Sequence, residues 1–465
     1  MRIVEFLLAI IAVACVLAFG GVSTISISFM ELGVGVLAIV CFWWKGWPGL
    51  SRGTVAILAL VLMVPVLQIV PLPRPVVALV SPMRLAFQEQ LPIPVNSASG
   101  AMPISVNAWA TRVGWLRLTC YVLAFLIAFQ LYKRRRQSAL GYVMAIVGLF
   151  EAGYGLFQYL TGWPYVWTYA TGLGRGTYVN RNHYAGLLEM VLPFVVAGIW
   201  FRAPWKHNTS YAIRWHNPFS PETAFWFTRL LLFAVVFTAL VFSMSKMGIA
   251  AALTGLLLVT GIALVRSTKR EGAAIALLLL ALPAAYAIWI GLAPVAEHFE
   301  LLGRPGSLEQ ERLPIWRDTL ALIRDYPLLG TGLGTYRWSS LHYQSHLLNY
   351  IYDHAHNDYL EFAADIGIPA ALLLFGSLWL VALKVARRAL ILERTQDRVL
   401  AAGCAGAMAA FLTHSLADFN LQIPANALIF AWIAGTAVAL IQVSGSRLHA
   451  SSSGFTSEGT GQGQD

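Results

Sequence analysis

The chain has 465 residues, of which 58% are hydrophobic and 12% are charged, and its formal net charge is +10. A soluble domain carries about 25% charged residues, so this deficit excludes an ordinary soluble protein. The basic residues lie in short clusters beside apolar stretches, which is typical of cytoplasmic loops and argues against nucleic acid as a partner. We therefore expect an all-α polytopic membrane protein, because lipid offers no partner to unpaired backbone groups.

About twelve transmembrane helices are expected, because a bilayer core takes about 20 apolar residues per helix. The first stretch, MRIVEFLLAIIAVACVLAFGG, has one basic residue and no convincing cleavage site, so we interpret it as a transmembrane helix rather than a signal peptide. All four cysteines lie in apolar stretches without CxxC spacing, which indicates small core side chains rather than disulfides or metal ligands. The expected spans are 3–22, 27–44, 53–70, 111–132, 138–160, 183–201, 228–243, 247–265, 272–292, 366–385, 399–417 and 425–443.

Basic clusters predict the orientation of the chain. Each follows an even-numbered span, so all share one side, which the positive-inside rule makes cytoplasmic, together with both termini. Residues 1–443 then form a transmembrane domain with a large extracytoplasmic loop at 293–365 that contains helices, and the Ser/Gly-rich residues 444–465 form a disordered cytoplasmic tail. The clusters are Lys133–Arg136; Arg202, Lys206 and Arg214; Arg266, Lys269 and Arg270; and Lys384, Arg387, Arg388, Arg394 and Arg398.

Polar residues gather where two outer segments meet the membrane. Asn180, Arg181, Asn182 and His183 lie at the start of the sixth span, where Asn182 can cap the helix. A helix N-terminus with these side chains can bind an anion, or it can be a plain polar cap and interfacial anchor. Lys246 lies between two apolar spans, where a cation is usually functional unless it snorkels to the interface.

The segment ERLPIWRDTLALIRDYP, residues 311–327, predicts an amphipathic helix that ends before Pro327. Its apolar face is expected to contain Leu313, Trp316, Leu320 and Ile323. Arg312 and Trp316 are four residues apart and share a face. The helix is expected to lie on the membrane surface or on the bundle and to present Arg312, although a solvated Arg on a plain amphipathic helix fits the same pattern. The following GTGLGTY has no strand–turn–helix context, which argues against a nucleotide loop.

The stretch DHAHNDYLEFAADIGIPA, residues 353–370, holds the side chains best suited to proton transfer. A neutral imidazole can take a proton from a hydroxyl, so His356 is the first candidate for a general base and Glu361 the second. His354 is expected to point away from His356, and Asn357 and Asp358 are candidate substrate-binding residues. The spacing fits no common zinc signature, so no metal is expected. A rival metal site would draw its ligands from His342, His346, His354, His356 and Asp358.

A fifth polar group lies in HSLADFNLQIPAN, residues 414–426. His414 and Asp418 are four residues apart, and we expect them on one helix face near the outer surface, as candidate substrate-binding residues. Ionisable residues in a span are rarely incidental. The alternative is a structural His–Asp pair that ties helices together.

From about residue 140 to residue 440, these stretches together resemble the O-antigen ligase and O-antigen polymerase superfamily of bacterial membrane glycosyltransferases. The motifs that carry the resemblance are VNRNHYAG, SMSKMG, RLPIW, PLLGTGLGTY and HAHNDYLEFAADIG. Ligases have His-Asn, nine residues and then Gly, a spacing that His356-Asn357 and Gly367 keep. Two positions depart from the pattern. Ala370 replaces a Gly, Thr or Tyr, and Lys246 replaces the usual Arg, which keeps the charge but not the bidentate fork.

The resemblance implies transfer of a glycan from an undecaprenyl-diphosphate carrier to an acceptor hydroxyl, without metal, nucleotide or other cofactor. The acceptor would be a glycan or lipid A–core. The site would face the periplasm from the bacterial inner membrane, among membrane lipids. Lys246, Arg312 and Arg181 could hold the diphosphate leaving group, and His356 would deprotonate the acceptor, with inversion at the anomeric carbon. Aromatic side chains could also stack on sugars, namely Trp316, Tyr336, Trp338 and Tyr359.

Within this superfamily, a ligase that acts on lipid A–core and a polymerase that extends a surface or exopolysaccharide both fit the sequence. A protein O-glycosyltransferase is a third possibility. Outside it, a lipid-glycan transporter or flippase without chemistry is the alternative. Transporters often show pseudo-repeated halves and helices broken at mid-membrane, which this sequence does not show. A purely structural membrane subunit is the remaining alternative.

Overall fold

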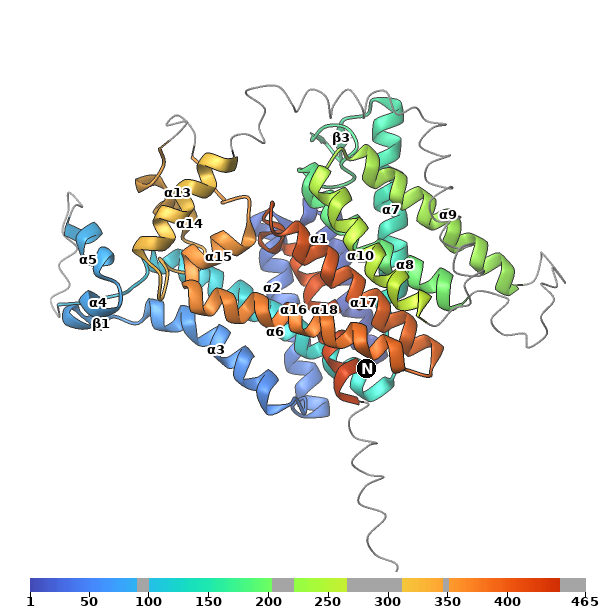
Figure 1. Ribbon diagram of the computed structural model, residues 1–465, viewed down its shortest axis with the longest axis horizontal. Helices are drawn as coiled ribbons and strands as arrows, with labels where there is room; N and C mark the ends of the chain where they lie inside the picture. Colours follow the sequence, from blue (N-terminus) through green and yellow to red (C-terminus); the bar gives the residue numbers. More distant parts are fainter. Residues whose placement is uncertain (90–99, 203–220, 266–311, 346–350, 444–465) are drawn as a thin grey trace, which may run out of the picture.

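The computed structural model describes residues 1–89, 100–202, 221–265, 312–345 and 351–443 (Figure 1). The ninth expected span at 272–292, residues 293–311 of the large loop and the 444–465 tail lie outside these ranges. Within them, the strands are two antiparallel pairs of two residues each: β1 (Leu72–Pro73) with β2 (Ala101–Met102), and β3 (Tyr165–Val166) with β4 (Tyr169–Ala170). The rest of the ordered architecture is helical, which confirms the expected all-α class.

In the described ranges, nine helices are long and apolar enough to cross a membrane. With α1 (Arg2–Leu17) and α17 (Thr395–His414), they provide a helix for every expected span except 272–292. The helix α1 ends before residue 22, because Phe19–Gly21 form the short 3-10 helix η1, in which Gly20 and Gly21 have positive φ. The nine are α2 (Thr24–Lys45), α3 (Arg52–Ile69), α6 (Ala108–Arg135), α7 (Leu140–Thr161), α8 (Arg181–Phe201), α9 (Pro221–Phe242), α10 (Lys246–Leu264), α16 (Ile368–Ile391) and α18 (Pro424–Val443).

Helix α8 lies at the centre of the bundle, where it contacts α9, α10 and α17, and its whole membrane-length window is buried. Small residues allow these helices to approach closely. A side chain added at Gly406 of α17 would meet Val259 of α10 and Pro193 of α8. Without a hydrophobic driving force between helices in lipid, such packing of small residues holds a bundle together. The ends of α8, α10 and α17 are therefore fixed relative to one another.

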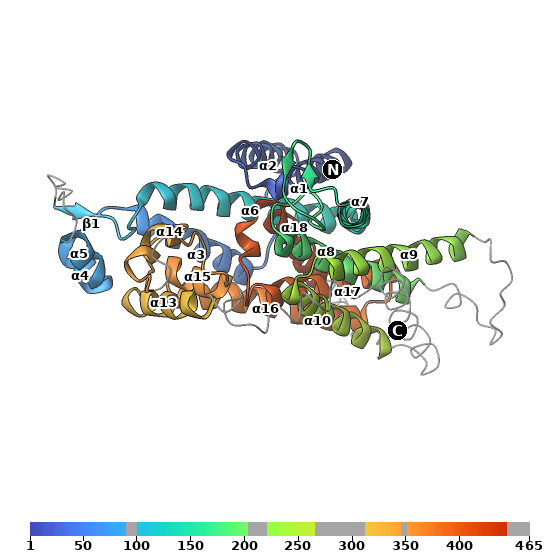
Figure 2. The same ribbon diagram turned by 90° about the horizontal axis from the view of Figure 1, so that it is seen from above.

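Short elements gather at one end of the bundle, which we call the loop end (Figures 1 and 2). They are α4 (Arg74–Val80), α5 (Pro82–Glu89), α13 (Arg312–Asp325), α14 (Tyr336–Ser339), the 3-10 helix η3 (Ser340–His342) and α15 (Asp358–Ile366). The helix α15 packs on α13 and α16 and also contacts the 3-10 helix η4 (Asn420–Gln422). These contacts bring the polar stretch around residue 356 to the turn that follows α17.

The opposite end carries arginines from several loops, and we call it the basic end. The helix α6 starts at the loop end, where Val106 N–H donates to the carbonyl of Thr331, and finishes at Arg135. The next residue, Arg136, pairs with Asp397 at 3.1 Å and accepts at its carbonyl from Arg394. Two of the basic clusters expected on one side therefore contact each other directly.

Candidate functional site

Three imidazole rings surround Phe419 at the loop end. The ring of His354 stacks on Phe419 with centroids 4.2 Å apart, and the rings of His356 and His183 meet it edge-on at 4.9 and 4.6 Å. The expectation that His354 points away from His356 is wrong. His356 has a φ of 50°, so this stretch is neither helix nor extended strand, and both rings contact the same side chain, Phe419. We call His183, His354, His356, Phe419 and the groups bound to them the histidine cluster.

Asp418 supplies the central negative charge of this cluster. Its Oδ1 lies 3.5 Å from His183 Nε2 and its Oδ2 lies 3.7 Å from Arg312 Nη2. Arg312 Nη1 also donates to the carbonyl of Ala417 at 2.8 Å, which fixes α13 over the turn. Burial raises the pKa of Asp418, but the neighbouring His183, His414 and Arg312 outweigh it and hold this pKa below its ordinary value. Asp418 is therefore ionised.

The expected placement of His414 and Asp418 on one helix face is wrong. The helix α17 ends at His414, and Asp418 lies in the turn that follows it. His414 Nδ1 instead pairs with Glu189 Oε2 of α8 at 2.7 Å, and both side chains are fully buried. Because the pair joins α8 to α17 directly beneath the cluster, it fixes the point from which the Asp418 turn starts.

His354 and Glu361 form a tight pair. His354 Nδ1 lies 2.8 Å from Glu361 Oε1, and Glu361 Oε2 accepts from the N–H of Ala355 at 2.8 Å. Burial lowers the pKa of His354, but the charge and hydrogen bond of Glu361 outweigh it and raise this pKa above the ordinary value of 6.5. Trp316 Nε1 donates to the carbonyl of Ala355 at 3.1 Å, so α13 also holds this pair in place.

His356 differs from His354 in charge and in hydrogen bonding. Burial, with a smaller contribution from the Arg312 charge, lowers the pKa of His356 below 6.5 despite the opposing effect of Asp418. Its Nδ1 is buried and has no hydrogen-bond partner among the residues that the structure describes. The lowered pKa favours an uncharged imidazole near neutral pH.

Asn357 and Asp358 hold the start of α15. Asn357 Oδ1 caps the helix by accepting from Leu360 N–H at 3.1 Å. Asp358 is fully buried, and its Oδ2 accepts from Ser415 Oγ at 2.8 Å and from Leu421 N–H at 3.1 Å. Burial raises the pKa of Asp358 well above its ordinary value. Asn357 thus caps α15, and Asp358 joins α15 to the turn after α17.

The helices α8 and α10 begin side by side. Asn180, not Asn182, caps α8, because its Oδ1 accepts from the N–H of Asn182 at 2.8 Å. Arg181 and Lys246 are the first residues of α8 and α10. A side chain added at Gly248 of α10 would meet Ala185 of α8, so the two N-termini are neighbours. Two helix N-termini and two cations at one place favour an anion.

The buried face of α13 differs from the expected one. It consists of Ile315, Thr319, Leu322 and Ile323, because α15 packs on that side. Leu313 and Leu320 are 66% and 55% exposed instead.

Two of the aromatic side chains expected to stack on sugars contact other side chains of the protein instead. Tyr336 is buried with its hydroxyl 2.7 Å from Thr319 Oγ1, and Tyr359 stacks on Phe375 at 4.0 Å. Trp338 is 45% exposed.

Sequence reasoning missed Phe419, Ser415 and Glu189. Glu189 was detectable, because an acidic residue inside an apolar span is rarely incidental. Phe419 gave no signal, since aromatic residues are common at membrane boundaries. In the described ranges, no group of three or more His, Cys, Asp or Glu side chains is arranged to hold a metal ion.

The fold and site define a multi-pass membrane protein with a buried cluster of histidines, an ionised Asp and an Arg at one end. Residues 231–375 match the family described as O-Antigen ligase, which confirms the predicted resemblance to the O-antigen ligase superfamily. The matched segment includes Lys246, Arg312 and His356. It supports an enzymatic role in glycan transfer at a membrane. No curated protein shows a significant match to the chain.

Proposed function

We propose that this protein transfers a glycan from an undecaprenyl-diphosphate carrier to an acceptor hydroxyl at the outer leaflet of the bacterial inner membrane, with inversion at the anomeric carbon. One observation carries the proposal. The uncharged imidazole of His356 lies in the same cluster as the cation of Arg312, so a proton acceptor and an anion-binding group are in place together.

His356 is the proposed general base rather than His354. A base must be unprotonated at the working pH, which the lowered pKa of His356 favours and the raised pKa of His354 opposes. Both oxygens of Glu361 are engaged, one by His354 and one by Ala355. We therefore assign Glu361 a positioning role, in which it orients His354 against Phe419.

Arg312, Lys246 and Arg181 are the proposed partners of the diphosphate. The leaving group gains negative charge as the glycosidic bond breaks, and fixed cations stabilise that charge most in a site that excludes water. The neighbouring N-termini of α8 and α10 add the positive ends of two helix dipoles. The hydrogen bond to the carbonyl of Ala417 orients Arg312, and Asp418 balances its charge at 3.7 Å, so other donors of the guanidinium remain for the diphosphate.

The reaction is a single displacement. The acceptor hydroxyl gives its proton to His356, and its oxygen forms a bond to the anomeric carbon from the face opposite the carrier. The bond between that carbon and the diphosphate oxygen breaks, and the electron pair leaves with the undecaprenyl diphosphate.

The proposed reaction includes no metal, so purified protein should keep its activity in excess chelator. Loss of activity in chelator, with recovery only on addition of magnesium, manganese or zinc, would contradict a metal-free reaction.

A transfer assay on purified protein with a lipid-linked donor tests the base. His356→Ala should lose about 10²–10⁴-fold in rate, and His356→Asn should be equally inactive, because an amide cannot take the proton. His354→Ala should be less severe. The matched control is His342→Ala, whose exposed ring contacts Phe87 outside the cluster. If only Glu361→Ala is inactive, the carboxylate is the base and the assignment of His356 is wrong.

The acceptor is tested in cells. In a deletion strain, loss of all long chains from intact lipid A–core identifies a ligase, whereas one repeat left on the core identifies a polymerase. Complementation with His356→Ala should reproduce the deletion phenotype. A His356→Ala strain with normal glycans would contradict the proposed chemistry, provided that the variant is present in the membrane.

A further inference from the structure

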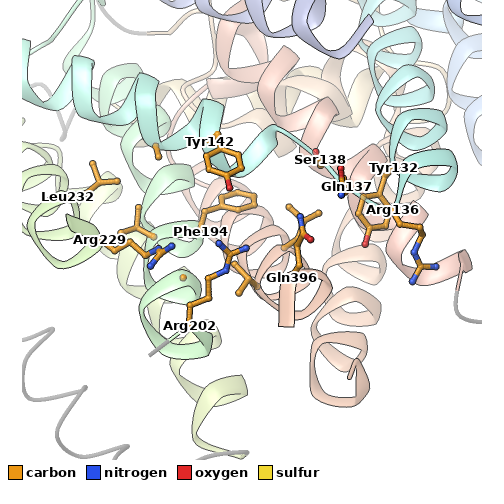
Figure 3. A pocket seen from close by; sticks show the side chains of 16 residues that line it. Tyr132, Arg136, Gln137, Ser138, Tyr142, Phe194, Arg202, Arg229, Leu232 and Gln396 are labelled. Atoms are coloured by element: carbon orange, nitrogen blue, oxygen red, sulfur yellow. The ribbon is translucent and has the colours of Figure 1, made fainter. Parts of the chain in front are cut away.

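A cavity at the basic end has no part in the proposed glycan transfer. Its volume is about 150 Å³, and it lies where the turn between α6 and α7, the end of α8, the first half of α9 and the start of α17 meet (Figure 3). His183 lies near the start of α8 and Arg202 directly after its end, so this 21-residue helix, roughly 30 Å long, separates the cavity from the histidine cluster.

Positive charge dominates the walls of this cavity. Arg136, Arg202 and Arg229 line it, and no carboxylate is among its lining residues. Arg136 is neutralised by Asp397 at 3.1 Å. Arg229 donates to the carbonyl of Phe225 at 3.2 Å, and it forms no ion pair with a carboxylate of the part of the chain that the structure describes.

The side chains of Arg202 and Arg229 reach the same wall beside Phe194 (Figure 3). Two guanidinium groups in one cavity repel each other unless an anion lies between them. Arginine forks fit phosphate oxygens in a bidentate manner.

The remaining walls suit an amphiphile rather than a free ion. Tyr142 and Gln396 offer hydrogen-bonding groups near the arginines, while Phe194 and Leu232 provide an apolar wall (Figure 3). The cavity also lies at helix ends, the depth at which phosphate headgroups meet the hydrocarbon core. Basic pockets between transmembrane helices are suited to acidic lipid headgroups.

We propose that this cavity binds the phosphate headgroup of an anionic lipid, with Arg202 and Arg229 on the phosphate and the apolar part of the lipid against Phe194 and Leu232. The site would hold α8, α9 and the α6–α7 turn together at the basic end. The proposal does not depend on the glycan-transfer chemistry.

Native mass spectrometry of the full-length, delipidated protein tests the site, with phosphatidylglycerol and phosphatidylethanolamine as probes. The wild type should retain phosphatidylglycerol preferentially. Each arginine should contribute roughly fivefold, so R202Q/R229Q should weaken binding roughly 25-fold. K384Q/R387Q is the matched control, because it removes two exposed charges from the last turns of α16 without touching the cavity, and it should keep the preference.

A second variant separates binding from folding. Leu232→Trp fills the cavity while both arginines remain, and it should lose phosphatidylglycerol as well. Equal retention of phosphatidylglycerol by wild type, R202Q/R229Q and Leu232→Trp would overturn the proposal. If R202Q/R229Q does not fold, phosphatidylglycerol binding by Leu232→Trp at the wild-type level is by itself enough to overturn the proposal. Displacement of the lipid by glycerol phosphate at equal concentration would show a soluble phosphate site and overturn the lipid assignment.

Discussion

At the scale of single residues, Asp418 sets the charge of the candidate site. It is fully buried, and it is the carboxylate that faces His183, Arg312 and His414 together. Its contacts at 3.5 and 3.7 Å are longer than ordinary ion-pair hydrogen bonds, so its effect is mainly electrostatic. In the absence of the donor, the negative charge of Asp418 balances the positive charge of Arg312. This lowers the energetic cost of holding the Arg312 guanidinium in a partly buried place.

Asp418→Asn should therefore destabilise the protein and lower its activity. Removal of one partner of a buried charge pair costs about 3–5 kcal/mol, because the other charge is left unpaired. Thermal unfolding of the purified variant measures the first effect and the transfer assay the second. Asp353→Asn is the control, since the Asp353–Arg337 pair is more than half exposed and should contribute less than about 1 kcal/mol. Equal stability of the two variants would contradict the central role of Asp418.

The pH dependence of transfer distinguishes the two histidines near the acceptor. A general base works only when unprotonated, so kcat/KM should fall as the pH drops through its pKa. Burial, Arg312 and His354 lower the pKa of His356, and they outweigh Asp418 and Glu361, which raise it. The acidic limb should therefore lie below pH 6.5. A limb above pH 6.5 that moves in Glu361→Gln would instead identify His354, whose pKa is raised.

Arg312 and Lys246 should each contribute to donor binding. A charge-assisted contact is worth roughly 1.5–3 kcal/mol, so Arg312→Ala and Lys246→Ala should each reduce transfer on the order of 10–100-fold. Lys246→Arg should be tolerated or improved, because it restores the bidentate fork usual in the resembling family. Transfer rates of the three variants with the lipid-linked donor measure these effects. Full activity in both Ala variants, with normal folding, would show that the anion site lies elsewhere.

At the scale of elements, the loop between α13 and α14 depends on one side chain from α3. Gln68 is fully buried, and its Nε2 donates to the carbonyls of Leu329 and Asp365 at 2.5 and 2.8 Å. Its Oε1 accepts from the N–H of Leu333 at 3.0 Å. The loop also approaches α15 so closely that a side chain at Gly330, where φ is 65°, would meet the Asp365 backbone. Gln68 of α3 thus fixes the loop that follows α13 against α15.

Gln68→Leu should lower the melting temperature strongly and reduce transfer. It leaves the carbonyl of Leu329 and the N–H of Leu333 without a partner among the described residues, each worth about 1–3 kcal/mol, whereas the Asp365 carbonyl keeps the N–H of Gly332 at 2.9 Å. Gln442→Leu is the control, because among the described residues that side chain has one hydrogen bond, a long one of 3.4 Å to Thr54 Oγ1. Thermal unfolding in detergent compares the two. A Gln68→Leu protein as stable as Gln442→Leu would mean that the loop is held by other contacts.

At the scale of the whole molecule, the two ends of the bundle are predicted to lie on opposite sides of the membrane. Leu341 is 47% exposed at the loop end, and Lys384 is exposed in the last turns of α16. All four native cysteines are buried, so single introduced cysteines can be labelled selectively. In intact spheroplasts, an impermeant reagent should label Leu341→Cys but reach Lys384→Cys only after lysis. The reverse pattern would invert the topology.

Sequence by itself determined the class of the protein and most of its helices. Apolar stretches of membrane length and one-sided basic clusters are local properties, because a helix in lipid must satisfy its own backbone and bury or expose its own side chains. The expected helix boundaries therefore agree with α2, α6, α7, α10 and α18 to within a few residues. The same holds for the family resemblance, because it rests on short contiguous motifs.

Tertiary structure alone decided how the polar residues meet. His183, His354 and Phe419 are far apart in the chain, and their rings meet because α8 packs on α17 and α15 contacts η4. The partner of His414 is Glu189 rather than Asp418, because the helix ends at His414 and the chain turns. Spacing rules assume a continuous helix, whereas charge and pKa depend on every buried group nearby, whatever its position in the sequence.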